Sequence, residues 1–329
     1  MRHLQLGAGA VLLLAACSMG SGSPAASTSS PQGSADATTY TTVVKAVGPS
    51  VVEIQTASGL GSGVVFDGQG DVVTNAHVIG DEQRLTVISS EGKQLNATLV
   101  GSYPPDDLAV IRVSGGNLKP ARWADSAKAV VGQVVLAIGS PLGLQSSVTQ
   151  GIVSATNRVV SEGSGITLPD TIQTSAAINP GNSGGALVEM DQTVLGIPTL
   201  AALVPGNGAP APGIGFAISS NRASDIASQL VQYGRVVNSH RAYLGVQTVP
   251  TTSDGVLVVG LVAGGPADKA SIRVGDLITS VAGTPTPTPG DLSKVLATKA
   301  PGNTVEVALV RADGGRATVQ ATLGELPGA

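Results

Sequence analysis

A serine surrounded by small residues is the first feature of this sequence that could do chemistry. Ser183 stands in the run Gly181-Asn182-Ser183-Gly184-Gly185. Glycines around a serine permit a tight turn that exposes the hydroxyl and points backbone N–H groups at a common position. A nucleophile beside such N–H groups is what acyl transfer requires. Ser183 is therefore the candidate nucleophile, and Gly181, Asn182 and Ser183 form the candidate oxyanion hole.

A serine hydroxyl needs a base near neutral pH, and the sequence offers few. The chain contains three histidines. His3 lies in an N-terminal apolar segment typical of targeting signals, and His240 lies in a late linker. His77, within the run TNAHVI at residues 74–79, is the remaining candidate base.

The third member of such a site is a carboxylate that orients the imidazole and stabilises its cation. The segment PPDDLAVIRV at residues 104–113 offers Asp106 and Asp107. Its prolines end a loop, and an apolar strand is predicted to begin directly after Asp107. A carboxylate at that junction can be partly buried and still reach a neighbouring loop. The chain order is then histidine, aspartate and serine, as in chymotrypsin-type proteases and unlike subtilisins or α/β-hydrolases.

The motifs TNAHVI, DDLAVI, NPGNSGGAL and GIGFAI, in this order, resemble the HtrA/DegP group of trypsin-like serine proteases. The resemblance extends from about residue 43 to residue 323 and includes a second domain. It implies the triad His77, Asp107 and Ser183, because the family motif places the acid directly before the Leu-Ala pair; Asp106 is the rival. It also implies two six-stranded β-barrels with the triad in their cleft. No cofactor or metal is expected.

The surroundings of the serine refine this expectation. Asn182 stands where digestive proteases carry an aspartate that pairs with a newly released N-terminus, and an amide cannot form that ion pair. Neighbouring loops must therefore order the turn. The resemblance places Ala177 at the base of the specificity pocket, with Ile178 and Ile197 nearby, so a small apolar pocket and cleavage after small or aliphatic residues are expected. Two segments near the site, residues 157–174 and 200–212, are rich in Gly, Pro and Ser and are predicted to be mobile loops.

The composition is typical of a protein built from short β-strands. Charged residues make up 12% of the chain and aromatic residues 2%, with 44 glycines and 20 prolines. From residue 43 onward, short β-rich runs alternate with turn residues, and residues 221–233 have helical spacing. This pattern predicts an all-β barrel or sandwich. The resemblance to the HtrA/DegP group makes the expected fold class all-β, with a double six-stranded barrel of chymotrypsin type at residues 40–233 and a small α/β domain after it. A net charge of −4 without a Lys/Arg block gives no indication of nucleic-acid binding.

The N-terminal residues 1–17 are predicted to be a targeting signal. Arg2 precedes an apolar stretch that is too short for a usual membrane-spanning helix and ends Leu14-Ala15-Ala16-Cys17. This resembles a bacterial lipobox, in which Cys17 is diacylated and becomes the mature N-terminus. Residues 18–39 are predicted to be a flexible linker. The expected location is extracytoplasmic and anchored to the bacterial membrane through Cys17; a secreted or periplasmic protein is the alternative.

The C-terminal residues 241–325, after a linker at residues 234–240, resemble a bacterial PDZ domain. The resemblance implies that Tyr243, Leu244, Gly245 and Val246 capture the carboxylate of hydrophobic C-terminal peptides on backbone N–H groups. The family usually has Gly-Leu where Ser271-Ile272 stands, and often Asn where Ala282 stands. These departures leave the predicted fold unchanged, and they leave the peptide preference open.

The expected function is a membrane-tethered serine endopeptidase that cleaves unfolded or exposed polypeptides for envelope protein quality control. Two alternatives use the same sequence features. One is a site-specific protease of an envelope-stress signalling pathway. The other is a largely non-proteolytic peptide-binding chaperone, against which the complete triad argues. Family members form trimers, so the resemblance implies a homotrimer or a larger assembly.

Overall fold

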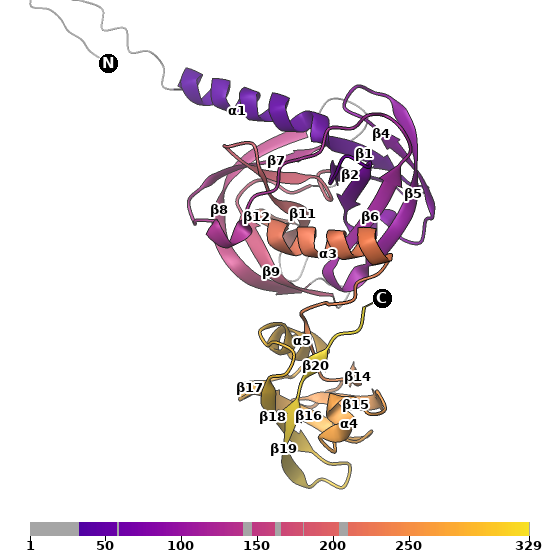
Figure 1. Ribbon diagram of the computed structural model, residues 1–329. Helices are drawn as coiled ribbons and strands as arrows, with labels where there is room; N and C mark the ends of the chain where they lie inside the picture. Colours follow the sequence, from indigo (N-terminus) through magenta and orange to yellow (C-terminus); the bar gives the residue numbers. More distant parts are fainter. Residues whose placement is uncertain are drawn as a thin grey trace, which may run out of the picture.

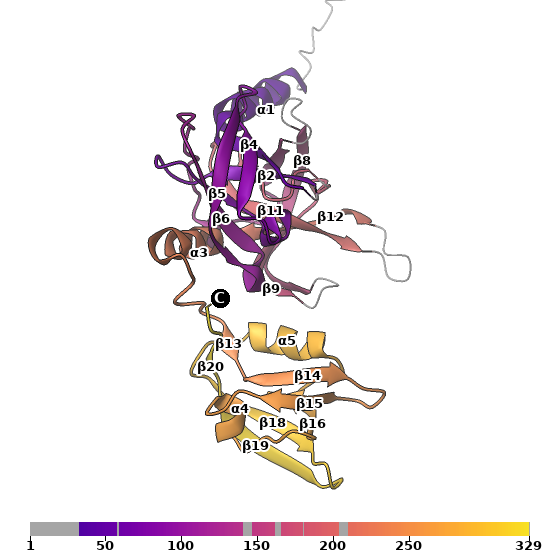
Figure 2. The ribbon, with the colours of Figure 1, turned by 90° about the vertical axis from the view of Figure 1, so that its right-hand side faces the viewer.

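The computed structural model describes residues 33–57, 59–140, 147–161, 166–179, 181–203 and 210–328. Cys17 and the predicted targeting signal lie outside the described residues. Figure 1 shows a larger part made of two β-barrels and a smaller C-terminal part below it. Figure 2 shows the same two parts from the side, with α5 on the face of the smaller part that lies toward the barrels.

Both barrels are closed six-stranded sheets, as predicted. The first has the order β1-β2-β3-β6-β5-β4, with strands Val51–Gln55, Leu60–Val65, Asp71–Thr74, Leu108–Val113, Gln94–Tyr103 and Arg84–Ile88. The second has the order β10-β11-β12-β9-β8-β7, with strands Ala186–Glu189, Val194–Leu203, Pro210–Ser219, Thr167–Thr174, Ser147–Ser161 and Val134–Gly139. Closure leaves no free sheet edge in either barrel.

The strands read as continuous apolar runs because both of their faces are buried. On β3, Val72 packs inside the first barrel and Val73 packs outside it, against the second barrel. On β10, Leu187 packs inside the second barrel and Val188 faces the first. Successive side chains of a strand point to opposite faces, so one run of valines and leucines supplies two cores.

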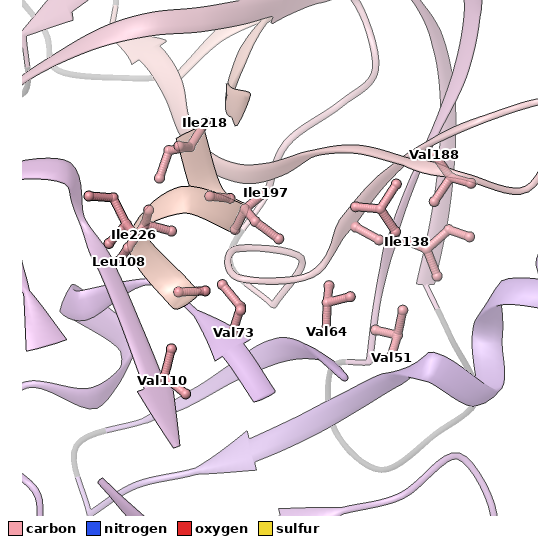
Figure 3. Close-up of a cluster of buried hydrophobic side chains, with 14 of the residues drawn as sticks. Val51, Val64, Val73, Leu108, Val110, Ile138, Val188, Ile197, Ile218 and Ile226 are labelled. Atoms are coloured by element: carbon pink, nitrogen blue, oxygen red, sulfur yellow. The ribbon is translucent and has the colours of Figure 1, made fainter. Parts of the chain in front are cut away.

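The residues on the facing outer surfaces form one core between the barrels (Figure 3), which we call the inter-barrel cluster. Its buried members include Val51, Val64, Val73 and Val110 of the first barrel, Ile138, Val188, Ile197 and Ile218 of the second, and Ile226 of the helix that follows. This cluster fixes the two barrels against each other and therefore fixes the loops that meet at their boundary.

A helix that the sequence analysis did not predict precedes the first barrel. Helix α1 spans Gly33–Val47 and so begins inside the segment expected to be a flexible linker. Val43 and Val47 are buried in the inter-barrel cluster, and Tyr40 and Val44 pack against it. Their spacing of three and four residues is that of one helix face. The run near residue 43, interpreted as the beginning of the β-rich region, is therefore the end of a docked helix.

The two segments predicted to be mobile loops are largely long hairpins. Strands β8 and β9 pair out to Ser161↔Thr167, and β11 and β12 pair out to Leu203↔Pro210. Pairing between the strands stabilises these segments as extended structure, although their glycines and prolines favour loops. The predicted helix near residues 221–233 is present as α3, Ser220–Tyr233, and it ends at Gly234, whose φ is 69° and whose N–H bonds to Leu230 O.

The C-terminal part is a sheet of the order β14-β15-β16-β18-β19, flanked by two short helices and the small pair β13-β20. Its strands are Val246–Pro250, Val256–Leu261, Leu277–Val281, Thr304–Val310 and Arg316–Thr322, with β13 at Ala242–Tyr243, β17 at Thr284–Pro285 and β20 at Gly324–Glu325. The helices are α4, Pro266–Lys269, and α5, Pro289–Ala297. Thr288 caps the N-terminus of α5, where its side-chain oxygen accepts a hydrogen bond from Asp291 N–H. A side-chain hydrogen bond from Thr288 also lowers the pKa of Asp291.

The two departures from the PDZ pattern fall at left-handed backbone positions. Ser271 has a φ of 59° and Ala282 a φ of 51°. Glycine is favoured in this region because it has no Cβ, and asparagine because its short polar side chain can form local hydrogen bonds. The surrounding turns hold both residues in place, with hydrogen bonds from Ser271 N–H to Asp268 O and from Ala282 N–H to Glu306 O. Among the described residues, no helix is both long and apolar enough to cross a membrane.

Candidate active site

The pairing of two strands in the first barrel brings His77 and Asp107 together. Thr74, the last residue of β3, pairs with Ala109 on β6. His77 follows β3 on the short helix α2, Ala76–Ile79, and Asp107 precedes β6 after the 3-10 turn η2, Pro104–Asp106. The register of the two strands therefore places the residue before β6 beside the residues after β3.

Asp107 is held by its backbone as well as by its carboxylate. Its φ is 51°, a left-handed value that costs energy for a residue with a side chain. Its carbonyl oxygen accepts hydrogen bonds from Ala76 N–H at 3.1 Å and from the Asn75 side-chain amide at 3.1 Å. These bonds fix the direction in which the Asp107 carboxylate leaves the chain.

The carboxylate of Asp107 is buried and receives donors from both barrels. The Nδ1 atom of His77 lies 2.9 Å from Oδ1 and 2.8 Å from Oδ2, and His77 N–H donates to Oδ1 at 3.0 Å. The aspartate side chain is 1% exposed, whereas the imidazole is 45% exposed. The buried acid therefore orients an imidazole whose other edge remains open to a reactant.

Thr199, on β11 of the second barrel, is a site residue that the sequence analysis missed. Its hydroxyl donates to Asp107 Oδ2 at 2.5 Å, and its carbonyl oxygen accepts from Ser183 Oγ at 3.4 Å. One residue thus contacts the candidate acid and the candidate nucleophile. No local sequence signal marks this role, because Thr199 stands within the apolar run of β11 and acts through contacts across the barrel boundary.

Ser183 lies on a tight turn pressed against the first barrel. It is half-buried, and its neighbours Asn182 and Gly184 are buried. The N–H of Gly184 donates to Pro198 O at 2.9 Å, next to Thr199. A Cβ atom on Gly184, whose φ is 78°, would lie 2.4 Å from Thr74 Oγ1 and 3.2 Å from Asn75 N. Only glycine permits this approach, which brings the serine beside the segment that leads to His77.

The side chain of Asn182 braces the turn from within. Its Nδ2 donates to Ala177 O at 3.0 Å, and its Oδ1 accepts from Asn179 N–H at 3.1 Å. Thr149, on β8, also donates to Ala177 O, at 2.8 Å. Hydrogen bonds thus hold the turn to its own preceding segment and to a neighbouring strand. The ion pair with a chain terminus that digestive proteases use at this position is not needed.

The structure separates the three residues predicted to line the specificity pocket. Ala177 is exposed and Ile178 is buried against Gly215, where a Cβ would lie 2.4 Å from Ile178 Cγ1. Ile197 is 0% exposed and belongs to the inter-barrel cluster, whereas Ile178 belongs to the core inside the second barrel. The two isoleucines therefore belong to different core clusters. Their lining of a pocket with Ala177 stays a prediction.

Asp106, the rival carboxylate, faces away from His77 and binds two arginines. Arg222 of α3 donates through Nη2 to Asp106 Oδ2, and Arg241 donates through Nη1 to Asp106 Oδ1 at 3.0 Å. Arg241 also donates to Thr167 O at 2.8 Å. This buried cluster joins the start of the C-terminal part to both barrels. Burial raises the pKa of the adjacent Tyr103, and the Asp106 carboxylate raises it further.

The four residues predicted to bind a peptide carboxylate border a groove in the C-terminal part. A cavity of about 200 Å³ between β14 and α5 is lined by Arg241, Tyr243, Leu244, Gly245, Val246 and Leu292, among others. Gly245 has a φ of 80°. Helix α5, one wall of this groove, also contacts β8 and β9 of the second barrel. Within the described residues there is no group of three or more His, Cys, Asp or Glu side chains that could hold a metal.

Comparisons with known proteins match both parts of the chain. Residues 61–197 match the family described as trypsin-like peptidase domain, and residues 242–323 match the PDZ domain family. The chain is 41% identical over 306 residues to the serine protease PepD of Mycobacterium tuberculosis, covering 86% of this chain and 65% of PepD. It is 39% identical over 279 residues to a probable periplasmic serine endoprotease, DegP-like, of Rhizobium meliloti, covering 81% of this chain and 53% of that protein.

The chain thus spans between about half and two thirds of the length of these curated relatives. A solved structure of an HtrA-type protease, AlgW with tripeptide, is similar over nearly its whole length. Its sequence identity is 32% and its TM-score 0.61, and the similarity covers 88% of this chain and 97% of AlgW.

Proposed function

The chain belongs to the HtrA family of trypsin-like serine proteases with a PDZ domain, and we propose that it is a serine endopeptidase whose triad is His77, Asp107 and Ser183. The observation that carries this proposal is the chain of contacts His77–Asp107–Thr199–Ser183 across the two barrels. The buried carboxylate of Asp107 contacts the imidazole of His77 directly and is joined to Ser183 through Thr199, so the three side chains that a triad requires meet at the barrel boundary.

In the proposed reaction, Ser183 Oγ attacks the scissile carbonyl carbon while His77 Nε2 accepts the hydroxyl proton. Asp107 accepts the Nδ1–H of the imidazole, keeps the ring in the required tautomer and stabilises the imidazolium that forms. The N–H groups of Gly181 and Ser183 stabilise the oxyanion of the tetrahedral intermediate. His77 then returns the proton to the leaving amine, and water repeats the sequence on the acyl-enzyme.

The proposed cleavage preference is for small or aliphatic residues. Ala177 brings no charge to the base of the pocket, so an arginine or lysine side chain would enter without a partner. Ile178 packs against Gly215 next to Ala177 in the chain, and in this proposal it lines a small apolar pocket. Such a pocket suits the short apolar side chains that become accessible in unfolded or exposed polypeptides, which are the proposed substrates.

The proposed role of the groove at Tyr243 to Val246 is to bind hydrophobic C-terminal peptides. Backbone N–H groups of this loop would bind the carboxylate, and the peptide would add as a strand beside β14. The proposed setting is the bacterial cell envelope, with the protein anchored through Cys17, and the name of the Rhizobium meliloti relative supports an extracytoplasmic location. A homotrimer or larger assembly is part of the same proposal.

The decisive experiment uses the purified full-length protein. Ser183→Ala and His77→Ala should abolish hydrolysis of denatured casein and covalent labelling by a fluorophosphonate probe, with thermal unfolding unchanged. Ser228→Ala, which removes an exposed hydroxyl on α3, is the matched control and should behave as wild type. Near-wild-type turnover in Ser183→Ala or His77→Ala would contradict the triad.

The same preparation distinguishes the alternatives. Many cuts across a panel of envelope proteins support quality control, whereas one or two cuts support site-specific signalling. Suppression of aggregation without any hydrolysis by the wild type would support the chaperone.

A further inference from the structure

Ser62, on β2, connects the first barrel to the turn that carries the proposed nucleophile. It is 0% exposed. Its backbone N–H donates to Ser183 O at 3.0 Å. Its carbonyl oxygen accepts from Thr74 Oγ1 at 2.7 Å, and Thr74 ends the strand that leads to His77. The backbone of one residue therefore contacts the turn of the serine and the strand of the histidine.

The hydroxyl of Ser62 makes two further bonds, both to the second barrel. It donates to Gly181 O at 2.5 Å and accepts from Ser140 N–H at 2.8 Å, next to the end of β7. A hydroxyl is the smallest side-chain group that can donate and accept at once. Ser62 thus satisfies a carbonyl of the serine turn and an amide of a neighbouring strand with a single atom.

Gly181 is the residue of the turn that most needs an external restraint. Its φ is 108°, in a region that glycine alone adopts readily, and it has no side chain that could hold it. Gly184 on the other side of the serine is already confined, because it packs so closely against Ser62 O that a Cβ would not fit and its N–H donates to Pro198 O at 2.9 Å. Steric contact therefore fixes one flank of Ser183, and the hydrogen bond from Ser62 fixes the other.

We propose that Ser62 is a positioning residue for the reaction at Ser183. Its hydroxyl holds the carbonyl of Gly181, which fixes the peptide plane beside the N–H groups of Gly181 and Ser183 and keeps them directed at one oxygen. The inference rests on the proposed function. Ser62 itself touches no reacting atom, since it is buried behind the turn.

Loss of the Ser62 hydroxyl should slow the chemical step more than it weakens substrate binding. Loss of its hydroxyl leaves Gly181 O and Ser140 N–H without this partner and frees the glycine to rotate. The oxyanion exists only after attack, so misdirected N–H groups slow the chemical step and leave the binding of the peptide largely unchanged. Displacements of about 1 Å in such sites cost on the order of 100-fold in rate.

The test compares two buried serines in the full-length protein. Ser62→Ala should lower kcat by about 10- to 100-fold with KM within about twofold of wild type. Ser220→Ala is the matched control, because Ser220 is also 0% exposed and its hydroxyl donates to a backbone carbonyl, Ala124 O, at 2.8 Å. It should lose a similar amount of thermal stability and keep its kcat. Wild-type kcat in a folded Ser62→Ala variant overturns the inference.

A transition-state analogue supplies a readout that a purely structural role would not change. A peptide boronic acid forms a tetrahedral adduct with the serine, so its inhibition constant should rise in Ser62→Ala by about the same factor as kcat/KM falls. An inhibition constant unchanged from wild type overturns the inference. If Ser62→Ala does not fold, Ser62→Cys retains the shape with a weak donor; its kcat should fall with KM unchanged, and an unchanged kcat overturns the inference.

Failure of the inference is distinguishable from failure of the proposed function. If wild-type protein neither hydrolyses peptides nor reacts with the fluorophosphonate probe, the peptidase proposal itself fails, and the positioning role of Ser62 fails with it. If the wild type and Ser62→Ala are equally active, only the positioning role fails.

Discussion

Asp106 and Asp107 are adjacent in the chain, yet their carboxylates have entirely different partners. Asp107 accepts from His77 and Thr199, whereas Asp106 accepts from Arg222 and Arg241. The left-handed φ of Asp107 turns the chain between them, so that one acid faces the proposed active site and the other faces the C-terminal domain. The same substitution at these two positions should therefore have different effects on activity and on stability.

Asp107→Asn should lower kcat by about four orders of magnitude, the size of effect known for a trypsin-like triad, because an amide favours the wrong imidazole tautomer. Asp106→Asn should not change the tautomer of the His77 imidazole. It removes the charge that pairs two largely buried arginines, so we expect a loss of about 3–5 kcal/mol in the free energy of unfolding. Steady-state kinetics and thermal unfolding of both variants check this. If Asp106→Asn has the lower kcat, the acid of the triad has been misassigned.

Thr199→Val should lower kcat by about 10- to 100-fold, because a hydrogen bond to a charged group contributes about 1.5–3 kcal/mol and this one orients the acid. Valine keeps the branched shape, so the packing of β11 is preserved. Thr199→Ser keeps the hydroxyl and is the control, with kcat close to wild type. A Thr199→Val enzyme as fast as Thr199→Ser would show that the bond to Asp107 is not used in the reaction.

Ile178→Ala should widen the proposed specificity pocket. Peptides that differ only in the residue before the cleaved bond should show a relative gain in kcat/KM for Leu or Phe over Val, by about 10- to 200-fold, the range found for small changes in apolar pockets. Ile197→Ala is the contrasting variant, since that side chain lies in the inter-barrel cluster. It should lose about 2–5 kcal/mol of stability with no change in preference. An unchanged preference in Ile178→Ala would exclude this residue from the pocket.

Local sequence properties were sufficient to predict a β-rich domain and the chemical types at the candidate site, whereas the two six-stranded barrels followed from the resemblance to a known family. The short apolar runs, the glycines around Ser183 and the scarcity of histidines are local properties, and each restricts what the chain can form. The PDZ match of residues 242–323 likewise follows motifs that are contiguous in the sequence.

The contacts that connect distant segments could not be predicted from the sequence. Thr199 acts on a residue 92 positions earlier in the chain, and Arg241 acts on one 135 positions earlier. Neither has a distinctive sequence neighbourhood, because their roles arise from how the barrels and the C-terminal domain dock. Helix α1 was missed for a different reason. Its residues Tyr40, Val43, Val44 and Val47 have helical spacing, but they follow a small polar stretch that was interpreted as a flexible linker.

Cys17→Ala should abolish incorporation of a fatty-acid analogue and move the protein out of the membrane fraction. Each acyl methylene contributes about 0.8 kcal/mol to membrane binding, so loss of the acyl chains removes the proposed anchor. Ser23→Ala, in the predicted linker, is the control and should keep both properties. Label retained on the Cys17→Ala protein would exclude acylation at that thiol.

The last prediction concerns Arg241, which lines the C-terminal groove and also donates to Pro105 O, directly before the two acids. A peptide with a free hydrophobic C-terminus should change the peptidase rate of the wild type, and its amidated form should bind more weakly, because it lacks the charge that backbone N–H groups attract. At saturating peptide, Arg241→Gln should respond less, since its side chain cannot reproduce the forked contact with Asp106 and Thr167 O. Measuring at saturation removes any difference in affinity from the comparison.

Arg273→Gln, at an exposed arginine of the same domain, is the control and should respond as wild type does. Full stimulation of Arg241→Gln would show that the groove communicates with the barrels by another route, such as the contacts of α5 with β8 and β9.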